Sequence, residues 1–220
     1  TLYPDSELYE TMSFWFGTGR VFSFDWTKLE DWIYMSHSGQ MKDRFGYGIT
    51  LFAQDEYYKN ILFEDNYGLE ISFKKSFSKS ISFDIKPKFG TEIIRLDAPY
   101  QARNTGLGLG VELKPSDEFK LNFRMDQSKS IKFDNNEVVY SDLIARARFE
   151  YQATTFLNFR LVTQYHRYYD TFDIQPLISY QPGPFSIFYL GTSRSYDTSL
   201  SGWQESYGQI YLKVQKLFSF

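Results

Sequence analysis

The 220-residue sequence contains no cysteine and only two histidines. The absence of cysteine excludes a disulfide framework and every metal site built on thiolates. No apolar run approaches the ~18 residues of a transmembrane helix. The formal net charge of −3 lacks the positive excess of a general nucleic-acid binder. These absences argue against a disulfide-stapled domain, a helical membrane protein and a nucleic-acid partner.

Aromatic residues are abundant by contrast. Phe, Tyr and Trp together make up 20% of the chain, whereas its mean hydropathy is negative. A water-soluble domain has to bury most of these rings in a core. A membrane β-barrel displays them on its outer surface and keeps polar groups inside. The aromatic content therefore favours a barrel if apolar and polar residues also alternate along the chain.

Apolar and polar residues alternate with a period of two in segment after segment. In residues 119–126, Phe119, Leu121, Phe123 and Met125 alternate with Lys, Asn, Arg and Asp. Successive side chains of a strand point to opposite faces, so such a segment has one apolar and one charged face. A soluble antiparallel sandwich also alternates. We favour a barrel because the segments approach the roughly 9–11 residues with which a tilted strand crosses a bilayer.

Turn signals divide the chain into about twelve strands. Short connections are expected at 76–79, 115–118, 153–155 and 181–184, and longer polar ones at 96–105, 129–138, 167–173 and 193–203. Outer-membrane barrels likewise alternate short periplasmic turns with longer extracellular loops. The expected strands are 8–17, 20–35, 44–55, 61–75, 80–94, 103–115, 118–130, 138–152, 156–167, 173–181, 185–193 and 204–220.

The predicted fold class is all-β. It is an antiparallel, up-and-down transmembrane β-barrel of about twelve strands in the bacterial outer membrane, in contact with the lipid bilayer. Residues 1–220 form one barrel domain, or the C-terminal part of a larger barrel. The first forty residues fit this pattern worst. There Phe22, Phe24 and Trp26 alternate, but the polar segment 28–31 interrupts the apolar face.

The chain ends in QIYLKVQKLFSF, in which Ile210, Leu212 and Val214 share a face with Phe218 and the final residue, Phe220. This ending resembles the C-terminal strand signature of bacterial outer-membrane proteins. The resemblance implies that Phe218 and Phe220 are an assembly signal and that the barrel-assembly machinery is a partner. Lys216 departs from the pattern on the apolar side, where its amine can snorkel to lipid headgroups.

A narrower resemblance covers roughly the last half of the chain. The segments LIARARFEYQATTFLNFRLVTQYH and FDIQPLISYQPGPFSIFYLG are similar to the end of a bacterial family that has a carbohydrate-binding-like N-terminal domain. The C-terminal barrel of that family has no known function. The matching positions include Arg146, Arg148, Tyr151 and Tyr180. They are mostly structural, so the resemblance implies a fold and no chemistry.

The charged faces of the predicted strands are the expected functional surface. With more basic than acidic residues around a narrow lumen, the barrel is predicted to act as a channel or transport component for small, possibly anionic solutes. A salt-bridged, filled interior remains an alternative. The predicted pore-lining residues are Lys86, Lys88, Glu112, Lys114, Lys120, Arg124, Asp126, Arg146, Arg148, Glu150 and Arg160.

A structural barrel that anchors a soluble domain or a partner is a second hypothesis. Aromatic residues of the long connections would then form a contact surface for a protein partner. They are Tyr168, Tyr169, Phe172, Tyr196 and Trp203.

A hydrolase at the barrel rim is a third hypothesis. It would use His166, which is expected on the polar face near Asp142, Asp170 and Asp173. A polar residue of the lumen is the simpler interpretation of His166, and His37 is interpreted as a turn residue. No catalytic residue, cofactor or metal is therefore assigned.

Overall fold

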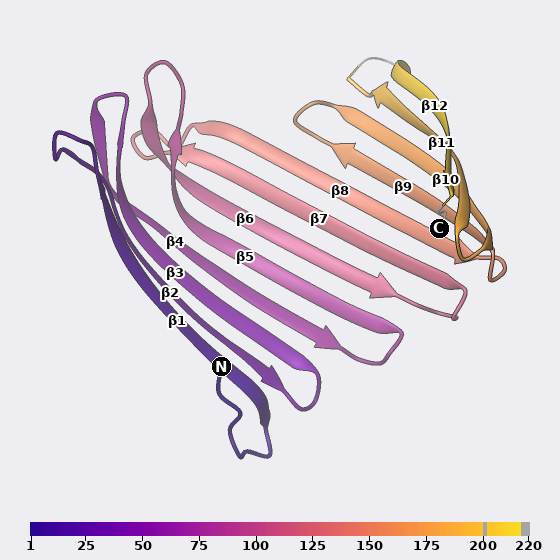
Figure 1. Ribbon diagram of the computed structural model, residues 1–220. Helices are drawn as coiled ribbons and strands as arrows, with labels where there is room; N and C mark the ends of the chain where they lie inside the picture. The colour runs from indigo at the N-terminus through magenta and orange to yellow at the C-terminus, as the bar shows by residue number, and fades with distance from the viewer. Residues whose placement is uncertain (200–201, 217–220) are drawn as a thin grey trace. The chain divides into compact units, whose positions relative to one another are not determined.

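The computed structural model describes residues 1–199 and 202–216, and all its regular elements are β-strands (Figure 1). No helix of this described part is long and apolar enough to cross a membrane. The strands are β1 (Tyr9–Phe22), β2 (Lys28–Met41), β3 (Phe45–Tyr58), β4 (Ile61–Ser76), β5 (Ile81–Ile94), β6 (Tyr100–Leu113), β7 (Phe119–Lys132), β8 (Val138–Gln152), β9 (Leu157–His166), β10 (Thr171–Gly183), β11 (Ser186–Asp197) and β12 (Gln204–Lys216).

The twelve strands form one sheet in which each strand is hydrogen-bonded to its neighbour in the sequence. Seven of the pairings are defined residue by residue, and all of these are antiparallel. The predicted all-β, up-and-down order of twelve strands is therefore confirmed. Contacts within the chain group it into two compact units. The first unit is Thr1–Ser76, Phe83–Leu109 and Gln127–Ser141, and the second is Phe77–Ser82, Gly110–Asp126 and Asp142–Phe220.

Several of the tight turns contain residues with positive φ angles. Lys59 and Asn60 join β3 to β4 with φ angles of 47° and 64°. Positive φ at both central residues is the mark of a type I′ hairpin turn, whose twist matches that of the flanking strands. Asn136 and Asp170 have φ angles of 57° and 48° in the connections after β7 and β9. Asn and Asp tolerate this left-handed conformation better than most residues.

The predicted boundaries of the first two strands were wrong. β1 extends to Phe22, and the chain turns at residues 23–27, where a strand through 20–35 had been expected. Trp26 has a φ of 64° and donates its backbone N–H to the Ser23 carbonyl. Apolar residues in this turn imitate the alternation of a strand, and the polar residues that follow begin β2. His37 lies inside β2 rather than in a turn.

The predicted contrast between short and long connections was also wrong. Polar segments expected to be loops belong to strands: β6 begins at Tyr100, β7 continues to Lys132, and β11 to Asp197. Backbone pairing does not require apolar side chains, so the ladder runs on where both faces become polar. The connections on the two ends of the strands are consequently similar in length, as in residues 95–99 and 114–118.

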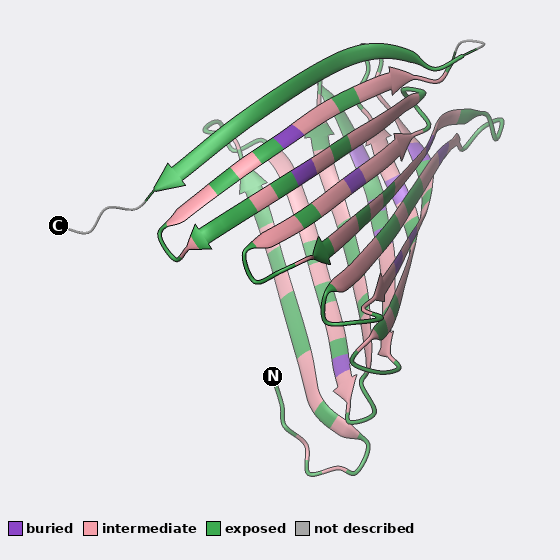
Figure 2. Ribbon diagram, turned by 90° about the vertical axis from the view of Figure 1, so that its right-hand side faces the viewer, coloured by how far each residue is buried: buried purple, intermediate pink, exposed green. Residues whose placement is uncertain are grey.

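The distribution of buried residues is inverted relative to a water-soluble domain. Among the described residues, the buried hydrophobic ones are Phe63, Ala102, Val162 and Leu177 alone. Large hydrophobic side chains are exposed on every strand except β6. Figure 2 shows how few positions of the strands are buried. Since every described strand belongs to the one sheet, no second sheet or helix of the described residues is available to cover the exposed rings.

Candidate functional site

The register of β1–β4 separates two faces of the first unit. Residues opposite one another in an antiparallel pair point to the same side of the sheet. One side, the apolar face, is dominated by aliphatic and aromatic residues. Its successive cross-strand rows are Phe14–His37–Ile49–Ile71, Phe16–Met35–Leu51–Leu69 and Thr18–Ile33–Ala53–Tyr67.

The opposite side of β1–β4, the polar face, is built from small, hydroxylated and charged residues with a few aromatic ones. Its successive rows are Ser13–Ser38–Gly48–Ser72, Trp15–Ser36–Thr50–Glu70 and Gly17–Tyr34–Phe52–Gly68. The predicted alternation is therefore present in three dimensions, and the two faces differ in chemistry.

Ion pairs mark one end of the apolar face. Arg20 and Asp31, which are opposite in register, form an ion pair of 2.6 Å. Lys28 bonds to Asp55 at 3.1 Å. On β3 the uncharged stretch from Phe45 to Ala53 has Asp55 beyond one end, and it covers about 26 Å at the usual rise of ~3.3 Å per residue. This length is close to the roughly 9–11 residues of a strand that crosses a bilayer.

The other end of the apolar face also carries an ion pair. Lys75, which is opposite Phe45, contacts Asp43 in the turn between β2 and β3. The apolar band of this unit is thus bounded by charges at both ends.

An apolar row also crosses the second unit. Tyr151, Phe159, Ile178, Leu190 and Leu212 are successive register partners from β8 to β12. All five side chains are exposed. The second unit therefore repeats the pattern of the first, with one face of its strands covered by large hydrophobic side chains.

The predicted pore-lining residues of the first unit lie on its polar face. Lys88 forms an ion pair of 3.1 Å with Glu70, a residue of that face. Lys86 points to the same side, because it is two positions before Lys88 in β5. Within the described residues Lys86 has no ion-pair partner, whereas Lys88 is neutralised by Glu70.

In the second unit the predicted acidic residues are all paired with predicted basic ones. Their ion pairs are Lys120–Glu112 at 3.0 Å, Arg124–Asp126 at 2.9 Å, and Arg148–Glu150. Lys114 lies just beyond β6, in the turn at 114–118, where it bonds to Asp117 at 2.8 Å.

Arg146 and Arg160 remain as basic residues without an ion-pair partner among residues 1–199 and 202–216. Arg146 is two positions from Arg148 along β8, and Arg160 is opposite Glu150 in register, so both share the charged face of these strands. The Nε atom of Arg160 is buried and has no hydrogen-bond partner. Together with Lys86, these residues give the predicted set an excess of uncompensated positive charge.

His166 and Asp142 are brought together as the sequence suggested. Nε2 of His166 lies 2.6 Å from Oδ2 of Asp142, whose side chain is only 6% exposed. Oδ1 of Asp142 accepts the backbone N–H groups of Tyr168, at 3.0 Å, and Leu143. Among the described residues no hydrogen bond or ion pair joins His166 to Asp170 or Asp173. Asp142 therefore anchors the turn at 167–170 to β8, and the described residues offer His166 no hydroxyl nucleophile at hydrogen-bond distance.

His37 occupies the apolar face of β2. Its ring stacks on Phe14, with 4.3 Å between the ring centroids. Its nitrogens contact the Tyr47 hydroxyl at 2.8 Å and the Ser13 carbonyl at 3.2 Å. Both polar atoms of the ring are thus satisfied locally, which fits a structural role. No cluster of acidic and histidine residues in the described part of the chain has the geometry to hold a metal ion.

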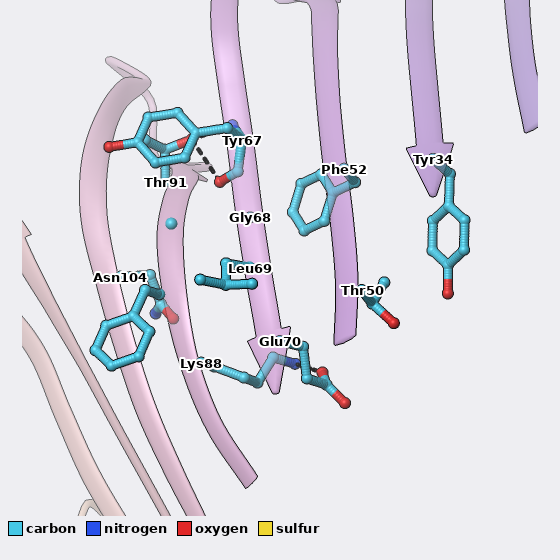
Figure 3. A pocket seen from close by; sticks show the side chains of 12 residues that line it. Tyr34, Thr50, Phe52, Tyr67, Gly68, Leu69, Glu70, Lys88, Thr91 and Asn104 are labelled. Carbon is cyan, nitrogen blue, oxygen red and sulfur yellow. Dashed lines mark hydrogen bonds and ion pairs between the residues drawn. The ribbon is translucent and has the colours of Figure 1, made fainter. Parts of the chain in front are cut away.

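Aromatic residues on the polar face were missed by the sequence reasoning. Trp15, Tyr34 and Phe52 belong to polar-face rows, and Trp32 is opposite Gly19 and Gln54 on the same side. The signal was present as a break in alternation, because these rings stand where β1–β3 should carry polar residues. Two of these rings, Tyr34 and Phe52, line a cavity of about 240 Å³ (Figure 3).

The predicted assembly signal, Phe218 and Phe220, lies outside the described residues. β12 leads toward it, with Ile210 and Leu212 more than two-thirds exposed. Of the aromatic residues predicted to form a contact surface, Phe172 and Tyr196 pack around Trp203, with ring centroids 4.9 and 6.0 Å from it.

Comparison with known proteins finds a structural likeness but no matching sequence. No family model and no curated protein matches the sequence. The chain is similar to a solved NanC porin structure at 9% identity, with a TM-score of 0.38, over 94% of this chain and 99% of the porin.

Proposed function

We propose that this chain is an outer-membrane β-barrel whose polar face encloses a water-filled passage for small solutes, with anions favoured over cations. The observation that carries the proposal is the inverted burial. Exposed rings and aliphatic side chains form continuous rows on one side of the sheet, and charges and hydroxyls form the rows on the other. In water such a surface would drive aggregation, whereas in lipid it is the favourable one.

Closure of the sheet is part of the proposal. In hydrocarbon each unpaired backbone N–H or C=O group costs several kcal/mol, so a spanning sheet has no free edge. Twelve strands lie between barrels of about eight strands, which side chains fill, and those of sixteen or more, which hold an aqueous channel. We therefore propose a narrow passage, in which single side chains affect the current.

The preference for anions rests on the balance of charges. Glu112, Asp126 and Glu150 are each held in an ion pair. Lys86, Arg146 and Arg160 have no such partner in the described part of the chain. Within this predicted pore-lining set the acids are compensated and three bases are not, and such an excess of positive charge raises the local concentration of anions.

Planar-bilayer recording of the purified chain tests this function. We expect discrete conductance steps and, in a KCl gradient, a reversal potential that shows higher permeability to chloride than to potassium. Replacing both Arg146 and Arg160 with Gln should move the reversal potential toward the potassium side. Arg20→Gln is the matched control, because Arg20 is paired at the end of the apolar face.

The possible results distinguish the channel itself from its preference for anions. A barrel that inserts but passes no current overturns the channel, and a barrel that conducts with a preference for potassium overturns only the preference for anions. An equal effect of Arg20→Gln and of the double variant would show that charge on the polar face does not govern selectivity.

We also propose the barrel-assembly machinery as a partner, on the pattern of the C-terminal strand. Deletion of Phe220 is expected to reduce the amount of folded protein in the outer membrane while leaving in-vitro folding into detergent unchanged. A truncated chain that accumulates in the membrane at the level of the full chain would contradict this role.

A further inference from the structure

Four aromatic side chains interrupt the polar face of the first unit. Trp15 lies on β1, Trp32 and Tyr34 on β2, and Phe52 on β3. Tyr34 and Phe52 are direct register partners, and Trp15 meets Tyr34 edge to face, with 4.7 Å between ring centroids. Rings on a face otherwise made of serine, threonine, glycine and charges are not required by contact with lipid, so they call for another explanation.

Glycines beneath the rings determine how the rings lie. A Cβ atom on Gly17 would stand 2.3 Å from the Trp15 ring, and one on Gly68 would stand 2.0 Å from the Phe52 ring. These rings therefore lean over the glycines and occupy the space in which a side chain would stand. A ring laid against the backbone in this way turns its other side outward. Trp15 is 54% exposed and Phe52 is 40% exposed.

Trp32 repeats the arrangement at the neighbouring position. A Cβ atom on its register partner Gly19 would lie 2.7 Å from the indole ring. The four rings thus form a shelf, which we call the aromatic shelf, across β1–β3. Two hollows adjoin it, of about 240 and 390 Å³, and both are lined in part by Tyr34 and Phe52. Both volumes fall near the lower end of ordinary ligand pockets, which measure about 300–1,000 Å³.

Hydrogen-bonding groups line one side of the shelf. The adjacent row of the polar face carries Ser36, Thr50 and Glu70, and Glu70 holds Lys88 at 3.1 Å (Figure 3). This ion pair leaves the row without net charge, while both of its side chains remain about half exposed. The row therefore presents donors and acceptors together, with no preference for a charged ligand.

An amide and a carboxylate line the other side. Gln54, which is opposite Trp32, and Glu30 both line the larger hollow. The amide nitrogen of Gln54 donates a hydrogen bond of 3.2 Å to Glu56. The rings in the middle thus have hydrogen-bonding groups at both edges.

We infer that the aromatic shelf is a binding site for the pyranose rings of a saccharide. One face of a pyranose carries C–H groups with partial positive charge, which are attracted to the negative face of an aromatic ring. Its hydroxyl groups lie at the edge of the ring, and each both donates and accepts hydrogen bonds. A mixed set of donors and acceptors, with Glu70 and Lys88 paired on one side and Gln54 and Glu30 on the other, matches that edge of hydroxyl groups.

The inference rests on the proposed function in one respect, because the polar face has to line an aqueous passage for a solute to reach the shelf. The charges that we propose to govern selectivity for ions, Arg146 and Arg160, belong to the second unit. Selectivity for ions and binding of saccharides can therefore be measured and perturbed separately.

Interruption of the ion current by sugars tests the site. Glucose, maltotriose, cellotriose and chitotriose would be added to single barrels in a bilayer, with a short polyethylene glycol as a control for size. We expect at least one trisaccharide to block the current in a saturable manner that the polyether does not reproduce. Phe52→Ala and Trp15→Ala should each weaken that block by roughly three- to tenfold.

Glycine variants test whether saccharide binding depends on the position of the rings as well as on their presence. Gly68→Ala retains every ring but forces the Phe52 ring off the backbone, so it should weaken the block as Phe52→Ala does. Gly39→Ala is the matched control, because its Cβ atom would meet the Tyr47 ring at 2.6 Å, and both residues belong to the apolar-face side of β2 and β3. It should leave saccharide binding unchanged, and the folded fraction of each variant is checked by its conductance.

The outcomes are distinguishable from those of the proposed function. A conducting barrel that none of the sugars blocks, or that Gly68→Ala and Gly39→Ala affect equally, overturns the saccharide site and leaves the channel standing. A barrel that passes no current overturns the channel. The site is then tested by tryptophan fluorescence in detergent with the same sugars, where the absence of a saturable change overturns it as well.

Discussion

Ile49 offers the sharpest test of where the membrane lies, because it is in the middle of the apolar face. It is midway on the chain between Asp43, in the turn before β3, and Asp55, so at the usual rise of a strand it lies at most about 20 Å from either. At a strand tilt of ~45° this distance corresponds to about 14 Å of depth. Ile49 would therefore lie close to the centre of an apolar band about 25 Å tall.

Arginine at this position distinguishes an Ile49 side chain that faces lipid from one that faces water. Near the midplane of a bilayer, arginine on the lipid face of a barrel destabilises the fold by roughly 2–4 kcal/mol. In water the same change at a side chain that is 40% exposed should stay within about 0.5 kcal/mol.

Ile33→Arg is the matched control. Ile33 is 41% exposed, is opposite Ala53 on the apolar face, and is two positions from Asp31 at the charged end of that face. The residue type, the substitution and the face are thus the same as at Ile49, the exposed fractions are nearly equal, and the depth differs. Near the interface the expected cost is about 0–1 kcal/mol.

Equilibrium unfolding by guanidinium in phospholipid vesicles, followed by tryptophan fluorescence, gives both free energies. We expect Ile49→Arg to lower the free energy of unfolding by at least about 2 kcal/mol more than Ile33→Arg lowers it. Equal losses at the two positions would refute the argument, because depth in a bilayer would then have no influence.

Two further predictions concern the polar connections. Asp142→Ala leaves the Tyr168 backbone N–H without its acceptor and should destabilise the turn at 167–170 by about 1–3 kcal/mol, seen as faster exchange of the Tyr168 amide hydrogen. Slow exchange in the variant would contradict the anchoring role. The hydrogen bond from Lys114 holds the pKa of Asp117 below its ordinary value of 3.8. Its stabilising contribution should therefore persist above pH 3.8 and be lost as the pH falls through the lowered pKa. An NMR titration should show this, and Lys114→Met should return the pKa of Asp117 to its ordinary value; an unchanged titration would contradict the pairing.

Much of the strand pattern could be predicted from the sequence, because a period of two is a local property of a sheet with two unlike faces. The strand predicted at 138–152 is β8, and those predicted at 61–75 and 80–94 differ from β4 and β5 by one residue at most. In each of these segments the apolar face continues to the turn, so that the boundary coincides with a change of composition.

The first two strands could not be predicted in the same way. Phe24 and Trp26 extend the alternation of β1 into a turn, and Trp26 adopts a φ that the pattern does not reveal. In β2, Trp32 and Tyr34 fill polar-face positions, so the period of two is obscured where the strand is regular. Alternation fails here because the polar face itself contains aromatic rings.

The candidate site, too, could be predicted only in part from the sequence. The ion pairs Lys120–Glu112 and Arg124–Asp126 join residues that the sequence had already assigned to one face. Which bases are left without a partner is a property of register and side-chain reach, and it appears only in the structure. The aromatic shelf depends on glycines that stand opposite rings on neighbouring strands, such as Gly68 and Phe52, and the sequence alone does not give that register.

The central claim is that the two faces of each strand meet different surroundings. Nitroxide labels placed singly at residues 47–53 of β3, in vesicles, measure this directly through their accessibility to oxygen and to a water-soluble nickel complex. We predict that oxygen accessibility peaks at 47, 49, 51 and 53, while access to nickel peaks at 48, 50 and 52. Uniform accessibility along the segment, in a chain that stays monomeric in buffer without detergent, would contradict the account.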